Sequence, residues 1–235
     1  MNRVLNRVGI EVRRLRTYPA EYDSLVWFLE YRKIPCVLDV GANEGQFASN
    51  LFAAGYTGTI ISFEPMPKEH RRLSERAANH PRWRVAPPMA LGERSATSEF
   101  HVAGNSISSS LLPMESLHLE AAPHSAEVGT IQVTVARLDE VLASILPSGV
   151  FLLKIDTQGT EREVIAGSAG VMDRMIGIST ELSFAPLYKG QALFSEMFDT
   201  INALGFKLAD LSPGFRRRRS AQELLQCDAL FLRPA

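Results

Sequence analysis

The stretch that most constrains the fold of this 235-residue chain is a short apolar run that ends in a glycine-containing turn. Residues 36–40 (CVLDV) are apolar except for Asp39, which is typical of a buried parallel strand. The turn GANEG at residues 41–45 carries two glycines, which bend the backbone sharply and let a ligand approach because they have no Cβ. Apolar residues then recur at helical spacing from Phe47 to Phe52. The stretch therefore predicts a strand, a tight turn and a helix, in that order.

The next predicted strand, residues 59–63, ends at Glu64 and Pro65. An acid at this point, about 20 residues beyond a glycine turn, is where nucleotide-binding sheets accept hydrogen bonds from ribose hydroxyls. The two glycines are spaced G-x-x-x-G, whereas a dinucleotide site needs G-x-G-x-x-G to cradle a pyrophosphate. Asp39 and Glu44 add negative charge, which favours a cationic or zwitterionic ligand. S-adenosylmethionine fits this description, and an ordinary strand-to-helix turn without a ligand is the alternative.

Composition excludes several classes of protein. Hydrophobic residues at 46% and charged residues at 22% are ordinary for a globular domain, and the net charge of −1 gives no reason to expect a nucleic acid or an anionic membrane as partner. Cys36 and Cys227 fall in predicted strands and are interpreted as small core residues in a reducing compartment, although a pairing stays open. No apolar run has the length of a signal peptide core or a membrane span. We therefore expect a cytoplasmic protein.

The chain divides into an N-terminal helical cap segment, residues 1–33, and a single domain, residues 34–235. The cap is basic and is interpreted as solvated, with contact to a membrane surface or an anionic substrate as the alternative. Residues 104–128 are rich in Ser, Pro, His and Ala and too long for a plain connection, so they are predicted to form a lid-like insertion. This segment contains His118, a candidate catalytic group or simply a solvated side chain. Residues 216–219 are four arginines in an exposed connection that is interpreted as a solvated loop, with binding of a phosphate-bearing acceptor as the alternative.

A second group of polar residues follows a later strand. The predicted strand 149–155 ends at Asp156, and the sequence TQGTE leads into a helix. Ligands bind at the carboxyl ends of parallel strands, and Lys154 and Asp156 share one side of this strand because side chains alternate. Polar groups within an apolar strand are costly unless they are used, although helix capping is an alternative role for Asp156. Glu181 lies near the end of the predicted strand 175–182 and could face the same crevice.

Further strands are predicted at residues 83–86, 95–102, 130–135, 206–209 and 227–232, with helices at 138–146 and 194–204. Two prolines end the strand 83–86 and place Met89 and Ala90 in the turn beyond it. In a nucleotide-binding sheet this turn lies beside the adenine, so both residues are candidates to pack on the ring. Plain turn packing is the alternative.

Taken together, these stretches resemble the FkbM-type S-adenosylmethionine-dependent methyltransferases. The resemblance runs from about residue 37 to the C-terminus and is carried by VLDVGANEG (37–45), SFEP (62–65), VARLDE (135–140), LKIDTQGTE (153–161) and TELSF (180–184), followed by Leu187 and Tyr188. It implies an α/β fold: a class I methyltransferase (Rossmann-like) doubly wound sheet of about seven strands. The sheet would be mostly parallel with the last strand antiparallel, and helices would cover both faces. It also implies O-methylation of a small molecule, a sugar or a polyketide- or glycolipid-type natural product.

The resemblance also implies roles for individual residues. Asp39, Gly41, Asn43 and Gly45 would hold the methionine part of the cofactor, Glu64 and Pro65 the ribose, and Met89 and Ala90 the adenine. Asp156 would lie where methyl donor and acceptor meet, as base, cofactor contact or metal ligand, with Glu181, Tyr188 and His118 as second choices for catalysis. Asp156 and Glu181 offer oxygen ligands of the kind magnesium prefers, so a divalent metal is an open option. No pattern of Cys and His indicates zinc.

Three other functions compete with this hypothesis. An NAD-dependent oxidoreductase would use the same ribose acid, but the third glycine is missing. A cofactor-binding protein without activity would have the same sequence pattern. A protein or nucleic-acid methyltransferase is disfavoured by the net charge and by the absence of the Asn/Asp-Pro-Pro-Tyr-type signature of amino-group methyltransferases. The acceptor and the oligomeric state, for which a homodimer is one option, stay open.

Overall fold

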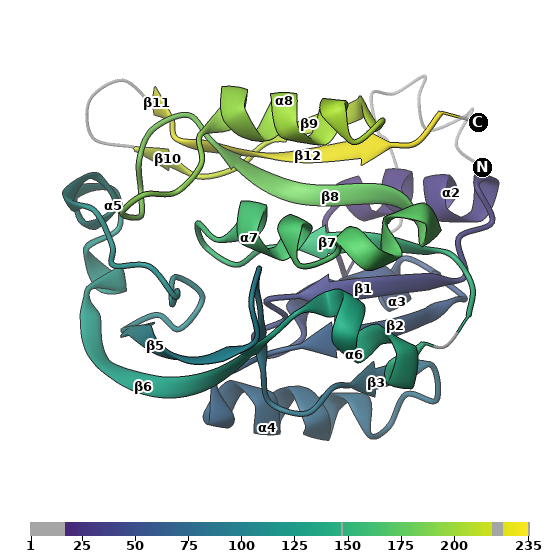
Figure 1. The fold of residues 1–235 in the computed structure, drawn as a ribbon, viewed down its shortest axis with the longest axis horizontal. Helices are drawn as coiled ribbons and strands as arrows, with labels where there is room; N and C mark the ends of the chain where they lie inside the picture. The colour runs from purple at the N-terminus through teal and green to yellow at the C-terminus, as the bar shows by residue number, and fades with distance from the viewer. Residues whose placement is uncertain (1–16, 147, 218–222, 235) are drawn as a thin grey trace, which may run out of the picture.

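A central sheet of seven strands organises the computed structural model, which describes residues 17–146, 148–217 and 223–234. The strand order is β3-β2-β1-β7-β8-β12-β9 (Figure 1). Neighbouring strands are parallel from β3 to β8, whereas β12 is antiparallel to both β8 and β9. This confirms the predicted sheet and its antiparallel last strand. The strands are β1 (Cys36–Val40), β2 (Thr59–Phe63), β3 (Trp83–Val85), β7 (Phe151–Ile155), β8 (Met175–Ser183), β9 (Lys207–Pro213) and β12 (Gln226–Leu232).

Helices cover both faces of this sheet because successive strand residues point to opposite sides. Val37 and Leu152 pack with α2, α3 and α4 on one face, and Leu38 and Leu153 pack with α6, α7 and α8 on the other. Both faces of the inner strands are buried, which explains why β1 and β7 are almost wholly apolar. The helices are α2 (Glu21–Tyr31), α3 (Gln46–Ala53), α4 (Pro67–Ala77), α6 (Leu138–Ile145), α7 (Glu161–Ala166) and α8 (Phe194–Ala203), with a 3-10 helix η3 (Ala169–Arg174).

A small second sheet lies beside the first and was not foreseen as a separate unit. It joins β4 (Ala90–Leu91), β5 (Ala96–Ala103) and β6 (Glu127–Ala136) in the order β4-β6-β5. The prediction that Ala90 lies in the turn beyond residues 83–86 is wrong, because Ala90 and Leu91 pair in parallel with Val135 and Ala136. A two-residue strand leaves no periodic signal in a sequence, and only its distant partner defines it.

The connection between β5 and β6 is the segment predicted as a lid-like insertion. It contains α5 (Ser116–Ala121) and a 3-10 helix η2 (Pro123–Ser125), so it has regular structure of its own. Movement of this segment as a lid stays a prediction.

Several other expectations concern the edges of the chain. Residues 1–16 of the predicted N-terminal cap lie outside the described residues, and the rest of that cap contains α2. Of the four arginines, Arg216 and Arg217 form β10 (Arg216–Arg217), which pairs with β11 (Glu223–Leu224), and residues 218–219 lie outside the described part. Cys36 and Cys227 are both buried and free. Among the described helices, none combines the length and the apolar character needed to cross a bilayer.

Candidate functional site

The carboxyl ends of β1, β2, β7 and β8 open onto one cavity of about 1050 Å³. This is at the upper end of the range for small-molecule sites, roughly 300–1,000 Å³, so a cofactor and a second ligand have room together. Most residues predicted for the site line this cavity: Gly41, Asn43, Glu64, Pro65, Met89, Ala90, His118, Asp156 and Glu181. Asp39, Gly45 and Tyr188 do not line it.

The glycine turn is pressed against the end of β7. Gly41 has a φ of +76°, and a Cβ there would overlap the carbonyl oxygen of Asp156. The Asp156 N–H in turn donates to the Val40 carbonyl at 3.0 Å, so the ends of β1 and β7 stay together beneath the cavity. Gly45 has a different reason to be glycine. Its φ is +86°, and a Cβ would lie 2.6 Å from the Trp83 ring, so it serves packing and does not face the cavity.

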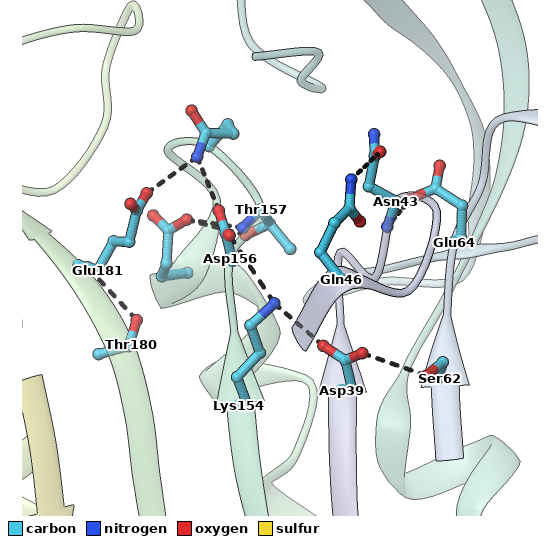
Figure 2. A network of polar contacts seen from close by, with 12 residues as sticks. Asp39, Asn43, Gln46, Ser62, Glu64, Lys154, Asp156, Thr157, Thr180 and Glu181 are labelled. Atoms are coloured by element: carbon cyan, nitrogen blue, oxygen red, sulfur yellow. Dashed lines mark hydrogen bonds and ion pairs between the residues drawn. The ribbon is translucent and has the colours of Figure 1, made fainter. Parts of the chain in front are cut away.

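Glu64 is fixed by the backbone of both neighbouring turns. Its Oε2 accepts a hydrogen bond from the Asn43 N–H and its Oε1 accepts one from the Met66 N–H, each at 2.8 Å (Figure 2 shows the first). Burial raises the pKa of this carboxyl to about 7, although the two N–H donors act in the opposite direction. Each carboxylate oxygen has a second lone pair, so the ionised group can still accept two hydroxyls.

Asp39 lies below the cavity floor and its charge is balanced. It is completely buried, Ser62 Oγ donates to its Oδ2 at 3.1 Å, and Lys154 Nζ lies 3.0 Å from its Oδ1 (Figure 2). Burial lowers the pKa of Lys154, but the charges of Asp39 and Asp156 outweigh it, so the pKa is raised and the ammonium stays protonated. Glu44, the other acid of the turn, pairs with two arginines of α4. The negative charge that these two acids were expected to add beside the turn is therefore compensated by cationic partners.

On the other side of the cavity, two carboxylates share one amide. Gln158 Nε2 donates to Asp156 Oδ1 at 2.7 Å and to Glu181 Oε2 at 2.9 Å. Gln226 Nε2 lies 3.2 Å from the same oxygen of Glu181. Burial, together with the nearby charges of Asp156 and Asp228, raises the pKa of Glu181 well above its ordinary value. Sequence reasoning missed both glutamines, although the TQG turn directly after Asp156 marked the position of Gln158.

Tyr188 contacts Gln158, and His118 contacts Tyr188 in turn. Tyr188 is 1% exposed, and its hydroxyl lies 2.8 Å from Gln158 Oε1 and 2.9 Å from the Ser108 carbonyl oxygen. Burial raises its pKa, so no phenolate forms near neutral pH. His118, on α5, is 3% exposed and meets the Tyr188 ring edge-on at 5.2 Å. The alternative that His118 is a solvated loop residue is wrong, and burial lowers its pKa to about 4, which keeps the ring neutral.

The part of the cavity around Ala90 contains two apolar residues, Met66 and Phe100, that the sequence did not indicate. Met66 and Phe100 pack with Ala90 into one apolar cluster, and both line the cavity. Ser106, from the predicted lid, accepts a hydrogen bond from Asn43 Nδ2 at 3.2 Å. Within the described ranges, no three His, Cys, Asp or Glu side chains are grouped so that they could hold a metal ion, and dependence on a metal stays open.

Comparison with known proteins shows the family to which this chain belongs. Residues 39–208, well over half of the chain, match the family described as the methyltransferase FkbM domain. The 2-O-methyltransferase NoeI of Sinorhizobium fredii is 26% identical over 173 residues, which are 71% of either chain. A solved structure from Klebsiella pneumoniae, of a protein proposed to be an O-methyltransferase, aligns with 100% of this chain and 88% of its own at a TM-score of 0.53 and 9% identity, which shows a shared fold. The chain belongs to the FkbM family of S-adenosylmethionine-dependent methyltransferases.

Proposed function

We propose that this protein transfers the methyl group of S-adenosylmethionine to a hydroxyl oxygen of a small, uncharged acceptor, such as a sugar or a polyketide- or glycolipid-type natural product. One observation carries the proposal: a buried acid suited to a ribose and a pair of carboxylates suited to a hydroxyl proton line the same cavity. The match to a 2-O-methyltransferase supports transfer to oxygen.

The cofactor would occupy the side of the cavity formed by β1, β2 and β4. Glu64 would accept the two ribose hydroxyls, and Met89 with Ala90 and Phe100 would pack on the adenine. The methionine part would then lie over Gly41, where the missing Cβ leaves space. In this arrangement Asp156, at the end of the neighbouring strand β7, would lie beside the sulfonium methyl.

Catalysis would then need positioning and removal of one proton. The acceptor oxygen attacks the methyl carbon in line with the breaking carbon–sulfur bond, and S-adenosylhomocysteine leaves with the electron pair. Holding the two reactants in line supplies much of the rate, because the sulfonium is already a strong electrophile. The hydroxyl is a weak nucleophile, so we assign its proton to the carboxylate pair of Asp156 and Glu181. The raised pKa of Glu181 makes it a stronger base than an ordinary carboxylate once it is ionised.

The rest of the cavity wall indicates an acceptor without negative charge. It is formed by α2, β9 and β12, and its acidic residues are Glu21, Asp23, Asp210 and Asp228. Among the described lining residues, Lys154 is the one lysine or arginine, and its charge is already shared between Asp39 at 3.0 Å and Asp156 at 3.8 Å. A phosphorylated acceptor or a nucleic acid would meet repulsion on this wall. Trp27, 64% exposed, adds a flat apolar surface on which a sugar ring or polyketide could pack.

The test begins with calorimetric titration of the protein with S-adenosylhomocysteine and, as control, with NAD. We expect binding of the first and none of the second, and NAD binding alone would overturn the proposal. Methyl transfer from labelled S-adenosylmethionine is then measured with neutral sugars and polyketides, and with phosphorylated sugars as matched anionic acceptors. Cofactor binding without transfer to any hydroxyl would favour a non-catalytic cofactor-binding protein instead.

A further inference from the structure

Gln158 occupies a backbone conformation that glutamine rarely adopts. Its φ is +58°, in the left-handed region, at the turn between β7 and α7. A non-glycine residue held there is strained and persists only where its surroundings determine it strongly. Such strain is a reason to ask what the side chain does.

The surroundings of Gln158 hold the turn from three sides. The carboxylate of Glu161 accepts hydrogen bonds from the Thr157 and Gly159 N–H groups at 3.0 and 3.1 Å. Ser110 Oγ donates to the Gln158 carbonyl at 2.7 Å. Gly159 adopts φ +108°, and a Cβ there would lie 3.0 Å from Tyr188 Cβ, so the turn is packed against the Tyr188 side chain. These contacts stabilise the strained conformation, and it therefore belongs to the native fold.

The contacts also fix the orientation of the amide. Its carbonyl oxygen lies 2.8 Å from the Tyr188 hydroxyl, and its nitrogen lies within 2.9 Å of both Asp156 and Glu181. The reversed amide would place an oxygen against two carboxylates, which repels, so the NH₂ group must face them. The Gln158 NH₂ group then donates one N–H to Asp156 and the other to Glu181, and it adds no charge to the site.

We propose that Gln158 is a positioning residue for methyl transfer: its amide holds Asp156 and Glu181 at a fixed separation so that the two carboxylates work as one base. The proposal rests on the proposed function. A neutral donor suits this task, because it compensates two partly buried carboxylates in part and leaves their mutual repulsion in place. A lysine in its place would ionise both acids fully and weaken them as bases.

The charges around Glu181 are consistent with this role. Burial is the largest influence and raises its pKa, and Asp156 at the end of β7, Asp228 on β12 and Glu161 on α7 act in the same direction. Lys154, on β7, opposes them. The N–H donated by Gln158 to Glu181 therefore stabilises an ionised form that the surroundings otherwise disfavour, so its removal should raise the pKa of Glu181 further.

The test compares Gln158→Met, which keeps the length and loses both donors, with Gln158→Glu, which keeps the shape and adds a carboxylate. We expect both to lower kcat by about 10- to 100-fold, to leave the dissociation constant of S-adenosylhomocysteine within about twofold, and to move the acidic limb of the pH–kcat profile to higher pH. Gln132→Met is the control, because it makes the same change at an exposed position of β6 that does not line the cavity. Lower kcat with an unmoved pH profile would mean a structural role only and would overturn the proposal.

A second readout separates this proposal from the proposed function. Carboxyl carbons of labelled Asp and Glu are titrated by NMR in the wild type and in Gln158→Met, without any acceptor. A rise in the pKa of Glu181 or Asp156 in the variant supports the positioning role even if no hydroxyl acceptor is methylated. Unchanged titration of both acids overturns it even if the protein proves to be an active O-methyltransferase.

Discussion

The two sides of the cavity are built by different means. On the β1–β2 side, the functional acid Glu64 is held by backbone N–H groups of Asn43 and Met66, at most 21 residues away. On the β7–β8 side, Asp156 and Glu181 are held by the side chain of Gln158, which depends in turn on Tyr188, 30 residues further along the chain. The first side is a local backbone arrangement, and the second is a network of side chains from separate elements.

This difference predicts different responses to mutation. A site made by the backbone tolerates changes around it, because the N–H groups remain whatever side chain is present. A site made by coupled side chains loses several contacts when one member is removed, and its effects do not add. We expect substitutions on the β1–β2 side to weaken cofactor binding without changing kcat, and substitutions on the β7–β8 side to lower kcat without changing cofactor affinity.

The largest expected effect comes from Asp156→Asn, which breaks the carboxylate pair and keeps the shape. We expect kcat to fall by about 10²- to 10⁴-fold, the usual contribution of a positioned acid or base. The affinity for S-adenosylhomocysteine should change only a few-fold, measured by calorimetry beside steady-state turnover. Asp173→Asn, in η3, is the control for loss of a carboxylate. If the affinity falls as far as kcat, Asp156 mainly binds the cofactor and the proposed separation of roles is wrong.

The second effect concerns the contact between the two sides. Gly41 and Gly190 have almost the same φ, +76° and +77°, but a Cβ at Gly41 would overlap the Asp156 carbonyl oxygen, whereas nothing lies within 4 Å at Gly190. Both alanine variants carry the left-handed strain, about 1–2 kcal/mol. Gly41→Ala adds overpacking of about 1–3 kcal/mol. Urea denaturation should therefore show the larger loss of unfolding free energy for Gly41→Ala. Equal losses would mean that β1 and β7 can separate freely.

The third expected effect is a pH dependence of cofactor affinity, caused by Glu64 on the β1–β2 side. Burial raises the pKa of Glu64 from 4.5 to about 7, so Glu64 holds its proton more tightly in the unliganded folded protein than in the unfolded chain. The stability that this group contributes is therefore lost as pH rises from 4.5 to about 7. Ribose hydroxyls donate best to the ionised form, so cofactor binding should lower the pKa and release a proton. Affinity for S-adenosylhomocysteine should then rise about tenfold between pH 6 and pH 8.

Glu64→Gln is the matched variant for this titration. It should bind S-adenosylhomocysteine about 10- to 100-fold more weakly at pH 8, because a hydrogen bond to a charged group contributes about 1.5–3 kcal/mol. Its affinity should be flat between pH 6 and pH 8. A wild type and a variant with the same pH dependence would show that another group titrates, and would remove Glu64 from the ribose site.

The same contrast explains how much the sequence could predict. Strands β1, β2 and β7 and the position of Glu64 follow from local signals: apolar runs, glycine spacing and an acid at a strand end, whereas the seven-stranded sheet was implied by the family resemblance. The pairing of Ala90 with Val135 carries no local signal, and neither does the bond between Gln158 and Tyr188, because each depends on residues far apart in the chain. Ion pairs between distant residues could not be predicted for the same reason. The pairing of Lys154 with Asp39 depends on the register of β1 against β7, which places the two residues side by side.

The smallest expected effect tests the acceptor end of the cavity. Trp27 and Tyr31 stack on each other at 5.2 Å on the outside of α2, and both are mostly exposed, but only Trp27 lines the cavity. If an acceptor ring packs on Trp27, Trp27→Ala should raise the KM for the acceptor by about 2- to 10-fold, because such a contact contributes about 0.5–1.5 kcal/mol. Its kcat and its affinity for S-adenosylhomocysteine should stay unchanged. Tyr31→Ala removes the same kind of exposed aromatic group away from the cavity and should leave KM as it is. Equal effects in the two variants would mean that the acceptor does not reach α2, and that its binding depends on the β7–β8 side alone.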